Sequence, residues 1–188
     1  WIVKERGLSC KPCYWASYAA AVCGLIYFPF ALIPVLQTGL IAFTTSITAW
    51  ILQFLSVPVV LESWNTMSLN GRSVQIILAC TAIESIALFA GLILSVQAPL
   101  RRKMTALAAS TLSIYSLNII RNGFVLMAYG WSWFGENSFD IAHNLIAKIG
   151  SAVALLAVSY LVFLLLPELL SIIDELAAEI RPRRGDAT

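Results

Sequence analysis

Charge is scarce in this chain. Of its 188 residues only 12% are Asp, Glu, Lys or Arg, whereas 60% are hydrophobic, and the mean hydropathy is +0.84. Soluble domains carry about 25% charged and about 45–50% apolar residues, so a water-soluble fold of this length could not bury so much apolar surface. The composition predicts an integral membrane protein with roughly four to six helical spans of about 20 residues each.

Features of several other protein classes are absent. The sequence has no basic stripe with interleaved aromatic residues, so nucleic-acid binding has no support. It has no internal repeat, low-complexity tract or polar linker, which predicts one membrane-embedded domain over residues 1–188. The chain begins at Trp1 rather than at Met, so we expect its natural start to have been trimmed.

Long apolar segments predict an all-α bundle of about four transmembrane helices. Three segments have a single charged side chain each and are long enough to span: 76–96, 104–127 and 146–166. A fourth apolar segment, residues 14–36, contains Pro29 and Pro34. Proline lacks a backbone donor and clashes with the preceding turn, so these residues should kink or end that helix.

Residues 38–55 have two interpretations. Their large apolar residues recur at steps of three and four among threonines, which indicates an amphipathic helix that spans the membrane or lies at its surface. If it lies at the surface, Lys4, Arg6 and the 181–184 tail all share one face with the 101–103 loop, as the positive-inside rule requires. We therefore prefer four spans with both termini cytoplasmic.

A small extended element is predicted before the 76–96 span. Apolar residues alternate with others over residues 57–75, on both sides of Asn70-Gly71. This pattern predicts a β-hairpin, with a loop longer than the tightest kind. In the preferred topology the hairpin is extracellular.

Three residues capable of chemistry are predicted to meet at the outer end of the bundle. Cys80 falls early in one span, Arg121 late in the next, and His143 at the entry to the last. An arginine within a membrane costs about 2.5–3.5 kcal/mol at the centre, so it faces the bundle interior or water. A thiol activated by histidine, beside a cation that stabilises negative charge, is a complete set for acyl transfer.

Four polar residues are expected to support this trio or to contact a substrate. Glu84 follows Cys80 by four residues, which would put both on one helix face. Asn118 and Asn122 flank Arg121 at helical spacing. Asp140 stands three residues before His143 and could orient it.

Each of these residues also has a purely structural interpretation. Cys80 could be packing in an apolar helix, and Arg121 could snorkel to the interface. His143 could cap its helix, and Asp140 could be a helix N-cap. Glu84 could neutralise Arg121 inside the bundle.

The remaining cysteines carry a weaker signal. Cys10 and Cys13 have the spacing of zinc sites and thiol redox motifs, and Cys23 could add one ligand. In the preferred topology the pair faces the reducing cytoplasm, which disfavours a disulfide. We predict no metal site and no cofactor.

Three short motifs resemble those of one family. Ala79-Cys80-Thr81-Ala82-Ile83-Glu84 resembles the cysteine motif of exosortases and archaeosortases, the segment 118–122 their arginine motif, and Ala142-His143-Asn144 their histidine motif. Order and spacing agree, and the resemblance covers a core of residues 38–166. Thr81 and Ala82 differ from the Ser/Asn-Gly common in bacterial exosortases and are closer to the archaeal branch.

The resemblance implies a cysteine peptidase or transpeptidase in the cell membrane of an archaeon or bacterium. Its partners would be proteins with a C-terminal sorting signal, consisting of a short motif, a transmembrane helix and a basic tail. Cys80 would form a thioester at the extracellular face, and a lipid amine or another acceptor would resolve it. His143 would act as general base and acid, and Arg121 would stabilise the oxyanion or the thiolate.

Two other classes stay open on the sequence. In a small transporter or channel subunit, Glu84, Arg121 and Lys148 would line a polar path. In a non-catalytic assembly subunit, Arg121 and Glu84 would pair for packing. The inner halves of the three clearest spans hold no ionisable side chain, which argues against the transporter.

Overall fold

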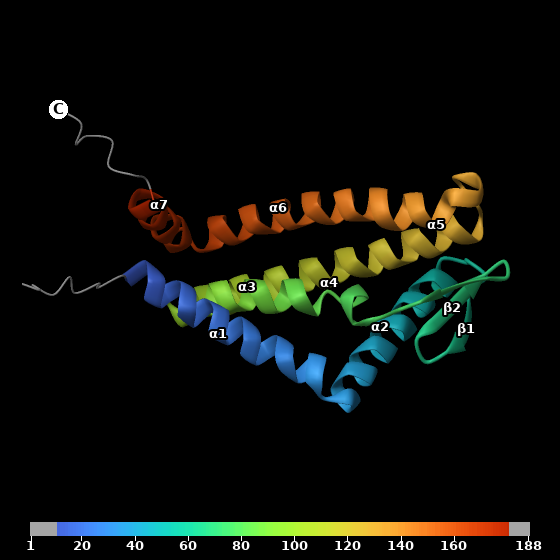
Figure 1. Ribbon diagram of the computed structural model, residues 1–188, viewed down its shortest axis with the longest axis horizontal. Coiled ribbons are helices and arrows are strands. Elements are labelled where there is room, and N and C mark those ends of the chain that lie inside the picture. The colour runs from blue at the N-terminus through green and yellow to red at the C-terminus, as the bar shows by residue number, and fades with distance from the viewer. Residues whose placement is uncertain (1–10, 181–188) are drawn as a thin grey trace, which may run out of the picture.

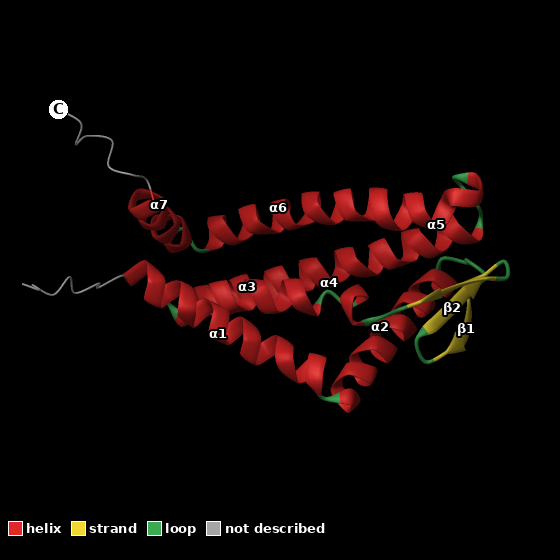
Figure 2. Ribbon diagram, in the orientation of Figure 1, coloured by secondary structure: helices red, strands yellow, loops and turns green. Residues whose placement is uncertain are grey.

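The computed structural model describes residues 11–180, and the side chains of residues 14–174. Lys4, Arg6, Cys10 and the 181–184 tail, as well as the Cys13 side chain, lie outside the described part. Helices make up most of the rest: α1 Lys11–Leu32, α2 Pro34–Phe54, α3 Ile83–Ser95, α4 Leu100–Gly130, α5 Ser138–Asp140, α6 Ala147–Leu165 and α7 Glu168–Ile180. The strands are β1 Val60–Ser63, β2 Thr66–Leu69 and β3 Arg72–Gln75 (Figure 2).

The helices form an elongated bundle with the sheet at one end. The main helices pack side by side: α1 packs on α3, α3 on α4 and α4 on α6. The start of α1 and helix α7 lie at one end of the molecule, and the sheet and α5 lie at the other, which we call the sheet end (Figure 1). The predicted all-α membrane bundle with a small extended element is confirmed.

Proline defines the first break in the bundle. Helix α1 ends at Leu32, and Ile33 is extended with φ −98° and ψ 108°. Pro34 then opens α2 at a position where its missing N–H costs nothing. The helix end predicted near the prolines is thus confirmed, although Pro29 remains inside α1. Helices α1 and α2 meet at an angle, and only together do they lead the chain to the sheet end (Figure 1).

Three helical stretches of the described residues are long and apolar enough to cross a membrane. They are Tyr14–Leu32, Pro34–Phe54 and Gly135–Leu165. The second contains residues 38–54, all but the last of the ambiguous residues 38–55, so the length and composition of this helix suit a span and not only a surface helix. Helix α4 has 31 residues but is more polar than these, and α3 has only 13 residues. The 76–96 span is therefore wrong in its first part, where the chain is extended and then turns.

The sheet has three antiparallel strands in the order β1-β2-β3. Asn70 and Gly71 have φ values of 53° and 75°, and Leu69 lies opposite Arg72. Two left-handed residues in a two-residue loop are the tight hairpin turn that Asn-Gly favours. The predicted hairpin is confirmed at this turn. Its loop length is wrong, because β2 lies within the residues expected to form the loop and pairs with both neighbours.

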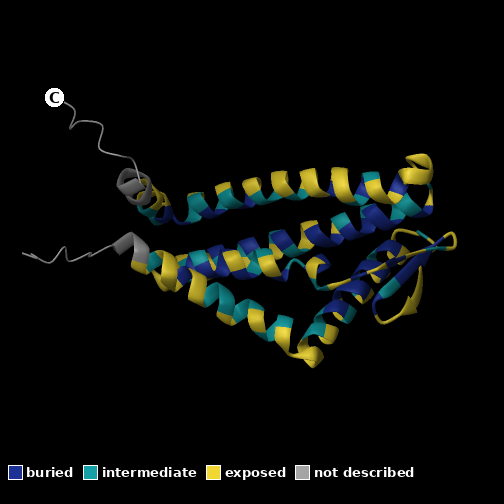
Figure 3. Ribbon diagram, viewed as in Figure 1, coloured by how far each residue is buried: buried dark blue, intermediate teal, exposed yellow. Residues whose placement is uncertain are grey.

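One face of the sheet is buried against the helices. Met67, Leu69 and Val74 join Leu52 of α2 and Leu126 of α4 in an apolar core. The sheet packs tightly on Gly130, where a Cβ atom would lie 2.6 Å from Cγ of Leu69, so glycine permits the sheet to approach the end of α4. Burial is concentrated at the sheet end and between α3 and α4, whereas α6 leaves a long outer side exposed (Figure 3).

Candidate active site

Cys80 lies on a 3-10 turn, Leu78–Cys80, between the sheet and α3. Its backbone amide donates to the carbonyl of Ile77, and the amide of Thr81 donates to that of Leu78. The Cys80 side chain is 8% exposed and belongs to the apolar core beneath the sheet. The prediction that Cys80 falls within the first turns of a helix is wrong, because α3 begins only at Ile83.

Two asparagines of α4 hold the turn that carries Cys80. The Nδ2 atoms of Asn118 and Asn122 donate to the carbonyl oxygen of Cys80 at 2.7 and 2.9 Å, and both side chains are buried. A buried carbonyl without a partner costs about 1–3 kcal/mol, so this pair fixes the turn against α4. Both predicted neighbours of Arg121 therefore contact Cys80 directly.

Arg121 lies between these asparagines in sequence and lines a pocket of about 640 Å³. Ala79 and Ala82, which bracket Cys80 and Thr81, form part of the same pocket wall, and most of the lining is apolar. The Nε atom of Arg121 is buried and has no hydrogen-bond partner. Buried donors are normally paired, so this unpaired Nε on a residue of the pocket lining is unusual.

His143 lies beside this region on a π-helical turn, Ile141–Ile146, that leads into α6. Its ring stacks on Phe139, with the centroids 5.2 Å apart, and Arg121 and Lys148 are both near enough to act on it electrostatically. Within the described residues, no hydrogen bond or ion pair joins the side chains of Cys80, Arg121 and His143. The structure thus brings His143 near Arg121, and the Cys80 turn to the wall of the Arg121 pocket.

Comparison with known proteins identifies the family. A family model described as transmembrane exosortase matches residues 13–160, which is most of the chain. The chain belongs to the transmembrane exosortases. It is 34% identical over 125 residues to archaeosortase A of Natronomonas pharaonis, and 37% identical over 118 residues to archaeosortase A of Haloferax volcanii.

The resemblance to the archaeal branch of the exosortase family is therefore confirmed. The two alignments cover 57% and 54% of this chain but only 40% and 39% of the relatives, so the chain spans less than half of their length. No solved structure matches it.

The segment that resembles the family's cysteine motif contains a strained residue. Ala82 has φ 62° and ψ 7°, the left-handed conformation, immediately before α3. A residue with a Cβ atom pays about 1–2 kcal/mol for this conformation, and glycine does not. Glycine therefore suits this position better than alanine does. Strain of this kind is typical of functional sites.

Ala82→Gly is expected to stabilise the protein by about 1 kcal/mol, because it relieves the left-handed strain. The matched control is Ala87→Gly in the interior of α3, where the side chain is buried and glycine should destabilise by about 1 kcal/mol. Thermal unfolding in detergent measures both, as midpoint shifts of opposite sign. A fall in the midpoint for both variants would show that Ala82 is not strained.

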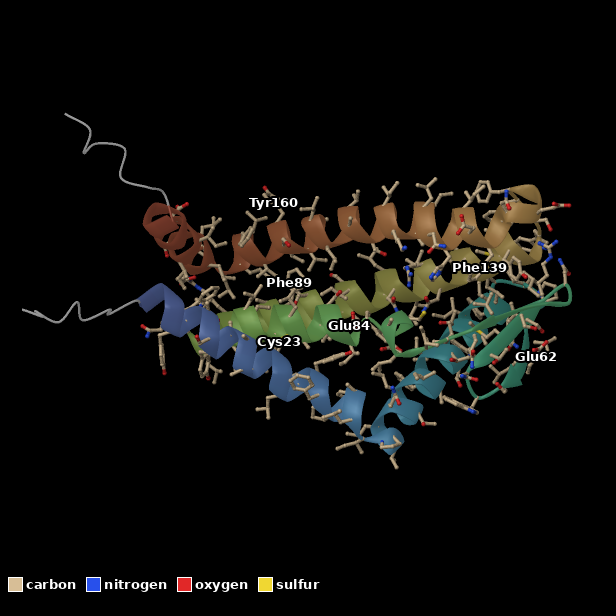
Figure 4. All side chains as sticks on the ribbon, viewed as in Figure 1. Cys23, Glu62, Glu84, Phe89, Phe139 and Tyr160 are labelled. Atoms are coloured by element: carbon tan, nitrogen blue, oxygen red, sulfur yellow. The ribbon has the colours of Figure 1, made fainter. Side chains whose placement is uncertain are left out.

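Glu84 and Asp140 are placed differently from the sequence-based expectation. Glu84 accepts a hydrogen bond from Tyr27 of α1 at 3.4 Å, and Figure 4 shows it on α3, away from Phe139 at the sheet end. The shared helix face with Cys80 is wrong, because the left-handed residue Ala82 separates the two. Asp140 directly precedes the turn Ile141–Ile146, at its N-cap position, but its side chain makes no cap hydrogen bond there. Its carboxylate accepts from Asn144 at 2.6 Å and not from His143, the residue that it could orient according to the sequence.

These placements also bear on the alternative functions. Arg121 and Lys148 line one pocket, but Glu84 is not part of its lining, so the three do not form one polar path. Among the described side chains Arg121 makes no ion pair with Glu84; Arg102 and Glu168 are the pair that forms. Lys148 itself was missed as a site residue, because one lysine in the first turn of a span has the same sequence pattern as an interfacial anchor.

Proposed function

We propose that this chain is a membrane cysteine transpeptidase that processes proteins at a C-terminal sorting signal. One observation carries the proposal: Cys80 sits on a turn that two side chains of α4 clamp beside the pocket of Arg121. These residues are those of the family's cysteine and arginine motifs. The similarity to archaeosortase A of two archaea supports the same activity.

The proposed reaction has two acyl-transfer steps. His143 takes the thiol proton, and the thiolate of Cys80 attacks a peptide carbonyl carbon. The C–S bond forms, Arg121 stabilises the negative oxygen, and the C–N bond breaks as His143 protonates the leaving amine. An acceptor amine or water then attacks the thioester carbonyl, and the Cys80 sulfur leaves and regains its proton. A lipid amine is the acceptor that the family resemblance favours.

In this scheme the bound substrate must gain access to the buried thiol of Cys80. The Cys80 side chain is 8% exposed, so the bound peptide must reach it through the wall formed by Ala79 and Ala82. Catalytic hydrogen bonds are often long in a free enzyme and tighten in the complex. In this proposal the sheet end faces the extracellular side, as the positive-inside rule predicts from the basic residues at 101–103.

Co-expression with a surface protein tests this function. The surface protein carries a C-terminal motif, a hydrophobic helix and a basic tail, and its control lacks the basic tail. We expect mass spectrometry to find a new C-terminus before the hydrophobic helix, only in cells with this chain and only on the complete signal. An unaltered C-terminus in those cells would contradict the proposed function.

A further inference from the structure

Strand β3 has one free edge. It is the last strand of the sheet and pairs only with β2. Residues that face each other across an antiparallel pair alternate between hydrogen-bonded and non-hydrogen-bonded. The tight turn makes Leu69 and Arg72 a hydrogen-bonded pair. Every second residue of β3 after Arg72 then bonds to β2, and this agrees with the amide of Ile76, which donates to the carbonyl of Asn65 at 2.7 Å. The backbone groups of Ser73 and Gln75 therefore point away from β2.

These outward groups have no partner in the part of the chain that the structure describes. Within that part of the chain, no hydrogen bond uses the amides of Ser73, Gln75 and Ile77, and none uses the carbonyls of Ser73 and Gln75. The three residues are exposed, whereas Val74 and Ile76 between them are buried. A row of unpaired amides and carbonyls on an edge strand is a template for another extended chain.

Helix α4 fixes this strand by its face and leaves its edge uncovered. The guanidinium of Arg72 lies 5.1 Å from the ring centroid of Tyr129 and donates to that residue's carbonyl at 2.9 Å. Asn70 donates to the carbonyl of Gly130, against which Leu69 packs. Leu69 and Arg72 point to the buried face, so these contacts hold the sheet without occupying the free edge.

The edge leads directly to the candidate nucleophile. From Gln75 the chain stays extended through Ile77, and Cys80 follows three residues later, with its carbonyl held by Asn118 and Asn122. In Figure 1 this segment runs from the sheet back toward the middle of the bundle. A chain paired along β3 would thus arrive at the Cys80 turn in a fixed register.

We infer that the free edge of β3 binds the extended segment of the protein to be processed as an added strand, which delivers its scissile peptide to Cys80. This rests on the proposed function and adds the means by which the substrate backbone is recognised. Strand addition draws its affinity from main-chain hydrogen bonds, so it accepts any segment that can be extended, and pockets beside the strand select the side chains.

Gln75→Pro tests the edge. Proline removes the outward amide of residue 75, which β2 does not use, and edge strands tolerate proline where the amide faces outward. Val74 before it is already extended, as proline requires. The matched control, Gln75→Ala, removes the side chain and keeps the amide. We expect processing of the co-expressed surface protein to fall about tenfold or more for Gln75→Pro, and less than twofold for Gln75→Ala.

A folded Gln75→Pro variant, judged by its elution profile and thermal midpoint, that processes as fast as Gln75→Ala would overturn the inference. That outcome leaves the proposed function intact, since processing would still be observed, whereas a failure of the function abolishes processing in the unaltered chain.

Photo-crosslinking gives a second test that needs no proline. In a Cys80→Ala background, p-benzoylphenylalanine placed at Ser73 should capture the surface protein, and the same probe at Val60 on the opposite edge strand should not. Capture of a second copy of this chain, equal capture from both positions, or no capture would each contradict binding at the β3 edge.

Discussion

Cys80→Ala is expected to lower the rate of processing by about 10³-fold or more, because removal of a catalytic nucleophile leaves only binding and oxyanion stabilisation. The matched control is Cys23→Ala. Cys23 is the other free cysteine among the described side chains; it lies on α1 and packs against Gly91 of α3. Its replacement should leave the rate within about twofold. The measurement is the rate at which the shortened surface protein appears.

The contrast between the two cysteines separates chemistry from packing. Both cysteines are partly or fully buried. If their role were purely structural, either substitution would lower the stability of the protein and would not act on the reaction itself. We expect the Cys80→Ala protein to keep its elution profile in detergent and still to bind the surface protein. Normal processing by this variant would remove Cys80 from the mechanism.

Arg121→Gln is expected to lower kcat by about 10²–10³-fold, the usual cost of losing one preorganised donor to an oxyanion. The buried, unpartnered Nε of Arg121 is the observation behind this expectation. The matched control is Arg102→Gln at the other end of the same helix. Arg102 pairs with Glu168 at 3.0 Å, and its side chain is 55% exposed, so the change should cost less than about 1 kcal/mol of stability and leave kcat unchanged.

The division of the effect between KM and kcat decides what Arg121 does. A donor that acts on the transition state lowers kcat with little change in KM. A rise in KM alone would mean that Arg121 holds the substrate in the pocket without stabilising the reaction. Equal losses of kcat for Arg121→Gln and Arg102→Gln would mean that both arginines act only by stabilising the fold.

Composition and motifs predicted a large part of this molecule. The scarcity of charge predicted the membrane bundle, Pro34 the end of α1, and Asn70-Gly71 a hairpin turn. The motif spacing singled out Asn118 and Asn122, since helical spacing puts residues four apart on one face, and the structure places both on the carbonyl of Cys80.

The geometry around Cys80 was not accessible to the same reasoning. An apolar run such as 76–96 has the same pattern whether it is extended or helical, so the change at Ile83 leaves no periodic signal. The left-handed conformation of Ala82 could not be predicted either, because alanine ordinarily favours a helix. With this residue between them, Cys80 lies on the 3-10 turn and Glu84 on α3, where its carboxylate accepts from Tyr27.

The surroundings of His143 were predicted only in part. Asp140 stands three residues before His143 and could orient it, but its carboxylate accepts from Asn144, one residue further along. Spacing alone does not decide between these two partners, because residues three and four apart lie on the same helix face. The third strand was missed because residues 60–69 contain a second turn, near Asn65, without the Asn-Gly signature.

Trapping the acyl intermediate tests the central claim most directly. Hydroxylamine attacks a thioester carbonyl, releases the cysteine thiol and leaves a hydroxamate on the new C-terminus. Purified protein is mixed with the surface protein and excess hydroxylamine, and the product is analysed by mass spectrometry. A thioester on Cys80 predicts a C-terminal hydroxamate with the unaltered chain and none with Cys80→Ala; cleavage that yields only a carboxylate, or a hydroxamate from both proteins, would contradict it.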